Sequence, residues 1–170
     1  MTGTACRAPT NSPLPLKMLI GLISDTHGMV RVEAIDALRG CDMIVHAGDV
    51  GSPHVLKSLG NLAPVYAVRG NTDREGWTDE LPWSQVIEAG DCSIYVLHIL
   101  DDLDLDPAAA GFQAVIYGHS HQPQIANKNG VLYINPGSAG PRRFRLPVSV
   151  ARLWAEADGL SAEIIELPVE

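Results

Sequence analysis

The sequence predicts an α/β fold built from two sheets. Between residues 18 and 68, apolar runs of strand length alternate with segments of helical periodicity. After residue 84, short β-rich runs follow one another with little helix between them. The chain has 170 residues, which is the usual length of a single domain.

The first half has the pattern of a βαβαβ unit. Strands are expected at residues 19–23, 43–45 and 65–68, and helices at residues 30–38 and 53–59. Right-handed crossovers lay such helices on a parallel sheet, which is then buried on both faces.

The second half predicts a second sheet. Its apolar runs are short and rich in β-branched residues, and they cover residues 85–88, 93–97, 114–117, 131–134, 148–154 and 162–167. One helix is expected to begin at Asp106-Pro107, because a capping residue precedes proline at the first helical position.

Residues 1–17 are expected to form a loose leader, followed by one domain at residues 18–170. The leader contains three prolines and has no apolar stretch of the length that a secretory signal needs. The first strongly patterned segment begins at Met18. We therefore leave the leader out of the predicted fold.

Composition excludes several classes of protein. The chain is 46% hydrophobic and 19% charged, too apolar for a disordered chain, and no apolar run reaches the roughly 18 residues of a membrane span. The 12 basic and 20 acidic side chains give a net charge of -8, which argues against a stable complex with nucleic acid. Cys6, Cys41 and Cys92 form no Cys-x-x-Cys motif, so a reducing cytoplasm is expected. A homo-oligomer remains open.

Five of the apolar runs end in polar clusters rich in metal-binding side chains. The clusters stand in the segments IGLISDTHG, MIVHAGDVG, VYAVRGNTD, IYVLH and VIYGHSH. Ligands of open α/β sheets bind beyond the carboxyl ends of the strands, so one site can collect all five clusters. Two carboxylates, one amide and four imidazoles are the candidate ligands: Asp25, His27, Asp49, Asn71, His98, His119 and His121.

This ligand set is large enough for two cations. In Asp25-Thr26-His27 and His119-Ser120-His121, alternate side chains of an extended segment point to the same side. Oxygen and nitrogen ligands without thiolate suit manganese, iron, zinc or cobalt, and they do not choose among these metals. Each cluster alone is compatible with an ordinary turn or cap, but five of them in order favour a site.

The clusters, in this order, resemble those of the calcineurin-like metallophosphoesterase superfamily. Gly-His-Ser-His at residues 118–121 and Asn-Pro-Gly-Ser at residues 135–138 are similar to its compact bacterial and archaeal phosphodiesterase branch. The resemblance runs from about residue 18 to the end of the chain. It implies an αββα sandwich, in which two facing mixed sheets are flanked by helices. It also implies metal-dependent hydrolysis of a small phosphodiester by a hydroxide that bridges two metal ions.

The resemblance assigns the ligands to two divalent transition-metal ions, with manganese expected and iron, zinc, nickel or cobalt as alternatives. Asp25, His27 and His121 would hold the first metal, and Asn71, His98 and His119 the second. Asp49 would bridge the two. Asn71, Asp49 and His98 are the residues expected to act in catalysis.

One motif departs from the branch. Its members commonly carry His-Gly-His where this chain has His98-Ile99-Leu100, so the metal-binding histidine remains but the turn glycine and the second histidine are absent. Arg69, Arg142 and Arg143 are candidates for assisting the phosphoryl group, with a solvated surface role as the alternative.

Several neighbouring residues leave two interpretations open. Asp73 either orients a ligand histidine or caps its own loop, and His46 either supports the site or belongs to the core. Trp77 and Trp83 are expected to pack beneath a loop rather than to stack on a substrate.

The competing function is that of a binding scaffold. Some eukaryotic relatives of this branch keep the fold, lose ligand residues and serve in protein trafficking. The complete ligand set of this chain favours an enzyme. A nucleic-acid exonuclease is disfavoured by the short chain and the acidic charge.

Overall fold

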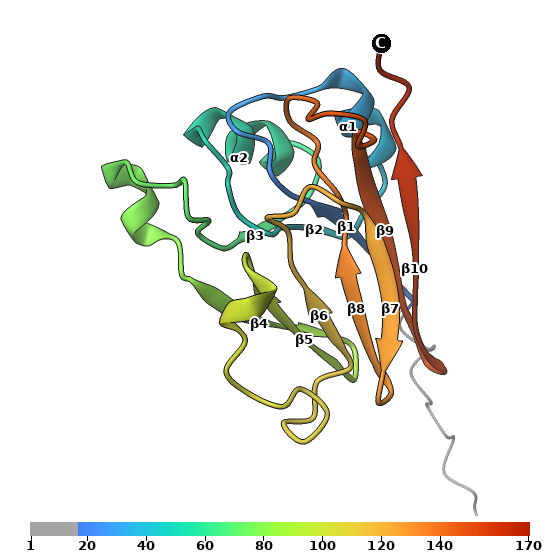
Figure 1. Ribbon diagram of the computed structural model, residues 1–170. Helices are drawn as coiled ribbons and strands as arrows, with labels where there is room; N and C mark the ends of the chain where they lie inside the picture. Colours follow the sequence, from blue (N-terminus) through green and yellow to red (C-terminus); the bar gives the residue numbers. More distant parts are fainter. Residues whose placement is uncertain (1–16) are drawn as a thin grey trace, which may run out of the picture.

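The computed structural model describes residues 17–170, so the predicted leader lies outside the described residues except for its last one. Two five-stranded sheets form the molecule (Figure 1). Both sheets are mixed, and in each of them three adjacent strands run parallel.

The first sheet has the strand order β10-β9-β1-β2-β3. Its parallel strands are β1 (Met18–Ile23), β2 (Met43–His46) and β3 (Val65–Ala67). The last two strands of the chain, β9 (Ser149–Glu156) and β10 (Gly159–Glu166), extend it by antiparallel pairing.

The second sheet has the order β4-β5-β6-β8-β7. Its strands are β4 (Ser84–Ala89), β5 (Cys92–Leu97), β6 (Ala114–Ile116), β7 (Gln124–Lys128) and β8 (Val131–Asn135). Strands β5, β6 and β8 run parallel, whereas β4 and β7 form antiparallel edges.

Two short helices, α1 (Val32–Ala37) and α2 (Pro53–Gly60), pack on the outer face of the first sheet (Figure 1). The Ser52 hydroxyl accepts a hydrogen bond from the His54 N–H and caps α2, and Pro53 occupies its first position. No helix among residues 17–170 has the length and apolar character to cross a membrane.

The main core lies between the two sheets. Ile20 and Leu22 of β1 and Leu153 of β9 pack there against Ile94 of β5 and Ile116 of β6, and all five are fully buried. A second core lies beneath the helices, where the opposite side of the first sheet meets Leu38 and Leu59. Burial on both faces explains why β1 and β2 are continuous apolar runs.

The outer face of the second sheet is covered differently. Leu97, Val115 and Tyr117 form a small cluster with Leu100 and Leu103, which belong to the segment after β5. This segment begins with the 3-10 helix η2 (Leu100–Asp102), and another 3-10 helix, η1 (Gly76–Glu80), precedes β4. The helix expected at Asp106 is a single turn, because Gly111, with a φ of 84°, ends it.

These observations confirm the predicted α/β sandwich and the βαβαβ start. Two features of the second half were predicted wrongly. Strands β9 and β10 belong to the first sheet, since β9 pairs with β1. Strand β7 was missed because its sequence QIANK is polar and mostly exposed at a sheet edge.

Candidate metal centre

The carboxyl ends of the parallel strands in both sheets meet at one edge of the sandwich. The loops after β1 and β2 stay paired beyond the strands, because the N–H groups of Asp25 and His27 donate to the carbonyls of Gly48 and Asp49. In the second sheet, the Gly118 N–H donates to the carbonyl of His98 and joins the ends of β5 and β6 in the same way. The predicted clusters therefore converge.

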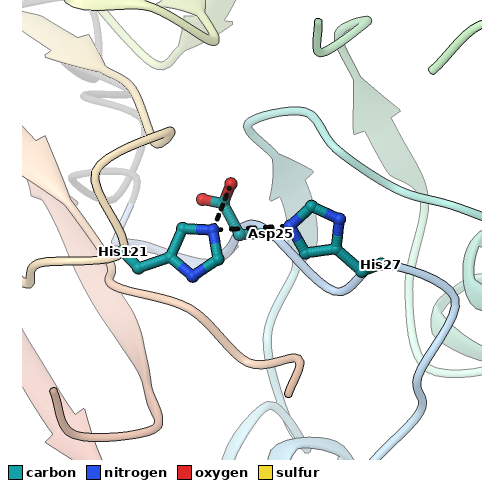
Figure 2. A group of neighbouring side chains, drawn as sticks. All are labelled: Asp25, His27 and His121. Carbon is teal, nitrogen blue, oxygen red and sulfur yellow. Dashed lines mark hydrogen bonds and ion pairs between the residues drawn. The ribbon is translucent and has the colours of Figure 1, made fainter. Parts of the chain in front are cut away.

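Asp25, His27 and His121 form the first group of ligand-type side chains (Figure 2). The Nε2 atom of His121 lies 3.3 Å from Asp25 Oδ1 and 3.4 Å from His27 Nε2. One ligand atom from each residue lies within 4.8 Å of the other two. A single cation can contact all three.

Asp49, His98 and His119 form the second group, again with ligand atoms within 4.8 Å of one another. His98 Nε2 lies 3.2 Å from Asp49 Oδ2, and the rings of His98 and His119 meet edge to face with their centroids 5.3 Å apart. Asp49 and His98 are buried, whereas His119 is exposed at the mouth of the site.

The two groups touch through their carboxylates. Asp49 Oδ2 lies 3.8 Å from His27 Nε2 of the first group, and Asp25 Oδ1 lies 3.8 Å from His98 Nε2 of the second. Two cations held by the two groups would therefore be neighbours, with a carboxylate between them.

Asn71, the remaining predicted ligand, follows β3 and lines the same cavity as His98. The next residue, Thr72, donates its backbone N–H to Asp49 Oδ1 over 3.0 Å. All seven predicted residues are thus brought to one edge of the sandwich.

Unpartnered polar atoms at this site fit a metal centre. Asp25 Oδ1, His98 Nε2 and His121 Nδ1 are buried and have no hydrogen-bond partner among the described residues. His98 Nδ1 lies 2.7 Å from the Ala47 carbonyl, which can only accept, so that nitrogen carries a proton and the neutral ring presents its lone pair at Nε2. Buried lone pairs without donors are costly, and a cation satisfies them.

Five of the seven residues have a left-handed backbone. Asp25, His27, Asp49, His119 and His121 have φ values of 55°, 46°, 54°, 71° and 61°. Each lies in a turn that follows a strand, so the expectation that Asp25-Thr26-His27 and His119-Ser120-His121 are extended was wrong.

Two glycines allow the loops to approach these carboxylates. A Cβ atom on Gly70 would collide with the side chain and backbone nitrogen of Asp49, and one on Gly118 would collide with the side chains of Ser24 and Asp25. Any other residue at these positions would force the neighbouring loop away.

His46 supports the first two loops from inside the protein. Its Nδ1 accepts from the Gly48 N–H over 3.2 Å, and its Nε2 donates to the Thr26 hydroxyl over 2.9 Å. That hydroxyl donates in turn to the Val50 carbonyl. Burial lowers the pKa of His46 to about 4, so the ring is neutral at neutral pH. Of the two earlier interpretations, a supporting role is the correct one.

Asp73 ties the Asn71 loop to the Asp49 loop. Its buried carboxylate accepts hydrogen bonds from the backbone N–H groups of Val50, Gly51 and Gly70. It makes no hydrogen bond to a histidine within residues 17–170, so the idea that it orients a ligand histidine was wrong. Each support combines a partner in its own loop, Gly48 or Gly70, with partners in another loop, and the contacts to the other loop have no local sequence signal.

Hydroxyl groups hold Asp25 in place. Ser24 donates to Asp25 Oδ2 over 2.7 Å, and Ser138, from the Asn-Pro-Gly-Ser segment, donates to the Asp25 carbonyl over 3.0 Å. Asn135 of the same segment donates to the Gly118 carbonyl before His119. This segment therefore braces the backbone at Asp25 and the turn that carries His119 and His121.

The charges at the site lower the pKa of Asp25 and Asp49 and raise that of His98 despite its burial, because the ring faces both carboxylates. Burial raises the pKa of Asp25, but the neighbouring His121 ring and the charge of His98 outweigh this effect, so the pKa is lowered. The pKa of Asp49 is likewise lowered, because His98 outweighs the effect of burial. Burial lowers the pKa of His27 despite the nearby carboxylates. Ionised carboxylates and the neutral His27 ring are the forms that bind cations, whereas a protonated His98 must release its Nε2 proton when a cation binds.

The surrounding residues correct two further expectations. Trp77 packs against the second core as predicted, but Trp83 is 62% exposed and lines the cavity beside His98. Arg69 donates to the Asp73 carbonyl and to Asp79, so it is held in the protein rather than solvated. Arg142 and Arg143 are exposed.

The His98-Ile99-Leu100 segment continues away from the ligands. Ile99 lines the cavity with a φ of -106°, which needs no glycine. Leu100 packs with Leu97 and Val115 on the outer face of the second sheet. This explains how the chain accommodates the absence of the His-Gly-His motif.

Comparison with known proteins places the chain in one family. Residues 18–158 match the calcineurin-like phosphoesterase superfamily domain. A probable metallophosphoesterase of Methanothermobacter thermautotrophicus is 38% identical over 160 residues, which cover 87% of this chain and 92% of that protein. A phosphodiesterase of Methanocaldococcus jannaschii is 30% identical over 138 residues, covering 71% of this chain and 83% of that protein.

The structure agrees with the sequence comparison. An archaeal phosphodiesterase of known structure superimposes with a TM-score of 0.75 at 26% identity, over 88% of this chain and 100% of that one. The matched region contains all seven residues of the site. The chain therefore belongs to the calcineurin-like phosphoesterase superfamily.

Proposed function

We propose that this protein hydrolyses a small phosphodiester with two divalent transition-metal ions, manganese first among them. The observation that carries the proposal is the pair of ligand groups, three residues each, that touch through Asp25 and Asp49. Relatives over most of the chain that are named metallophosphoesterase and phosphodiesterase support the same reaction.

In this proposal each side chain has a defined task. Asp25, His27 and His121 hold one ion, and His98 and His119 hold the other together with the Asn71 amide. Asp49 would serve both ions, since its carboxylate lies 3.8 Å from His27 Nε2 and 3.2 Å from His98 Nε2. The Ala47 carbonyl keeps His98 in the tautomer that presents Nε2.

Bound metal ions at this site would act as Lewis acids toward the phosphoryl oxygens and lower the pKa of water. The chain itself orients the substrate. Asn71 and His98 line the cavity that opens beside the second group, so an ester placed there has its phosphate at the ligand cluster. The Asn71 amide can donate to a phosphoryl oxygen and stabilise the charge that develops there.

An enzyme explains the buried ligand atoms better than a scaffold does. A protein that only bound partners would gain nothing from unpartnered polar atoms of Asp25 and His98 inside the fold. The support that Asp73 and His46 give to the loops is also more extensive than a surface turn requires.

The experiment measures metal content and hydrolysis together. Wild-type protein loaded with manganese should contain two ions per chain and cleave bis-p-nitrophenyl phosphate faster than p-nitrophenyl phosphate. His119→Ala should lose most of this activity, whereas His54→Ala, which removes an exposed histidine from the start of α2, should keep it.

Asp49→Asn tests the bridge. If Asp49 contacts both ions, this change should lower the manganese content at both positions, as measured by elemental analysis and calorimetry. One site or none in the loaded wild type would refute the dinuclear centre. Activity equal to that of His119→Ala with every metal tried would favour the scaffold.

We also propose a reducing, cytoplasmic location. Its support is that Cys41 and Cys92 are buried free thiols. Mass spectrometry of the native protein under alkylating conditions would detect a disulfide if this were wrong.

A further inference from the structure

A cavity of about 240 Å³ opens from the second ligand group onto the edge of the second sheet. Asn71 and His98 line it on the side of the ligands, together with Trp83, Tyr95, Asp102 and Asp104. Ligand pockets are usually roughly 300 to 1,000 Å³, so this cavity suits one small organic group rather than a polymer.

One wall is a preorganised aromatic surface. The Arg69 guanidinium lies over the Trp83 ring, 4.8 Å from its centroid, and is itself held by the Asp73 carbonyl and by Asp79. The indole nevertheless remains 62% exposed. With a cation already on one face, the ring is a better partner for an uncharged planar group than for a second cation.

Two carboxylates of the lining offer only hydrogen-bond acceptors. Asp102 and Asp104 line the cavity, are exposed, and form no ion pair within the described residues. The one cation lining the cavity, Arg69, already pairs with Asp79. The excess negative charge disfavours a second phosphate and favours a group that carries N–H donors.

We propose that this cavity binds an amino-bearing nucleobase, so that the substrate is a nucleoside phosphodiester with a single phosphate. The base stacks on Trp83 and donates N–H groups to Asp102 or Asp104, while the phosphate lies at Asn71 and His98. The placement of the phosphate rests on the proposed function, whereas the base site rests on the cavity alone.

Binding of nucleosides to the metal-free protein tests the base site without turnover. Adenosine should bind, as followed by calorimetry and by the indole N–H resonance of Trp83, and ribose should not. Purine riboside, which lacks the amino group, should bind several-fold more weakly than adenosine. Trp83→Ala should weaken adenosine binding by about tenfold, as expected for the loss of one base stack.

A matched set of acidic variants tests the donor contacts. Asp102→Ala with Asp104→Ala should abolish the preference for adenosine over purine riboside. Asp101→Ala, an exposed residue in the same 3-10 helix that does not line the cavity, should preserve it. Adenosine binding no tighter than ribose, equal binding of choline, or no effect of Trp83→Ala would overturn the base site.

Turnover then tests the substrate class. Adenosine 2′,3′-cyclic phosphate should have a higher kcat/KM than ethylene phosphate, which carries the same five-membered diester without a nucleoside. Trp83→Ala should reduce that ratio by about tenfold through KM. Protein that cleaves bis-p-nitrophenyl phosphate but does not bind adenosine would refute the base site alone. Protein that binds adenosine but cleaves no ester would instead refute the proposed hydrolase.

Discussion

His46 shows how one buried residue can make the whole protein sensitive to acid. Its Nδ1 accepts a hydrogen bond from the Gly48 N–H, and its Nε2 donates one to the Thr26 hydroxyl. Protonation of Nδ1 would break the hydrogen bond from Gly48. Its pKa is lowered from 6.5 to about 4 by burial. The unfolded chain therefore binds a proton between these values that the native protein does not.

The expected consequence is a loss of stability on acidification. Between pH 6.5 and pH 4, the unfolding free energy of the metal-free protein should fall by about 3 kcal/mol through His46 alone. Urea unfolding at pH 7 and pH 4.5 measures it. His46→Gln, which can still accept and donate, should lose this part of the pH dependence. An unchanged slope in the variant would show that His46 does not carry it.

Asp73 is the residue whose removal should separate the Asn71 loop from the Asp49 loop. The two carboxylate oxygens of Asp73 accept hydrogen bonds from three backbone N–H groups. The amide of Asp73→Asn has only one acceptor oxygen, so at least one of these N–H groups loses its partner. The buried donors left without a partner should cost about 1 to 3 kcal/mol, measured as a drop in melting temperature of several degrees.

The control for this change is Asp79→Asn, in an exposed position of the same segment. It should alter stability by less than about 0.5 kcal/mol. Equal effects of the two variants would mean that the three hydrogen bonds do not stabilise the loops.

Among the elements, the loop after β3 approaches the loop after β2 so closely that Gly70 leaves no space for a side chain. In Gly70→Ala the added methyl group would displace Asp49. We expect roughly 10- to 100-fold weaker manganese binding by calorimetry, the range found when supporting contacts of metal ligands are lost. Gly76→Ala, where a Cβ meets nothing within 4 Å, is the matched control and should bind manganese normally.

Strands with a buried apolar face could be predicted from sequence, and those without one could not. β1, β2, β5 and β6 are apolar runs because they are buried. β7 follows no such pattern, since it lies at an edge and its side chains face solvent. The pairing of β9 with β1 escaped prediction because order within a sheet depends on partners more than a hundred residues apart.

The candidate ligands could be predicted because chemistry and position coincide in them. Each follows an apolar strand and carries a metal-binding side chain, and the structure brings all seven to one edge. The prediction that Trp83 packs beneath a loop was wrong, because neither its chemistry nor its position in the sequence determines its surroundings. Whether an indole packs beneath a loop or lines a cavity depends on the position of Arg69 and Asp102, which the local sequence does not encode.

Across the whole molecule, metal binding should couple to stability because the ligands come from both sheets. Manganese at one hundred times its dissociation constant should add about 2.7 kcal/mol per site, if the unfolded chain does not bind it. For a chain of this size, the melting temperature should rise by roughly 5 to 10 °C for each site that is filled. Chelator should reverse the shift. The Asp49→Asn protein should show little change, and an equal shift there would indicate binding elsewhere.

The left-handed turns that carry five of the ligands place metal-binding side chains at the site but lower the stability of the fold. Each such turn on a residue other than glycine costs about 1 to 2 kcal/mol, and a typical domain has a total stability of only about 5 to 15 kcal/mol. A library selected for heat resistance alone would therefore drift toward asparagine or glycine at His27, His119 and His121, and it would lose the imidazoles on the way. Thermostabilisation of this protein should spare these positions and work on surfaces remote from the ligands.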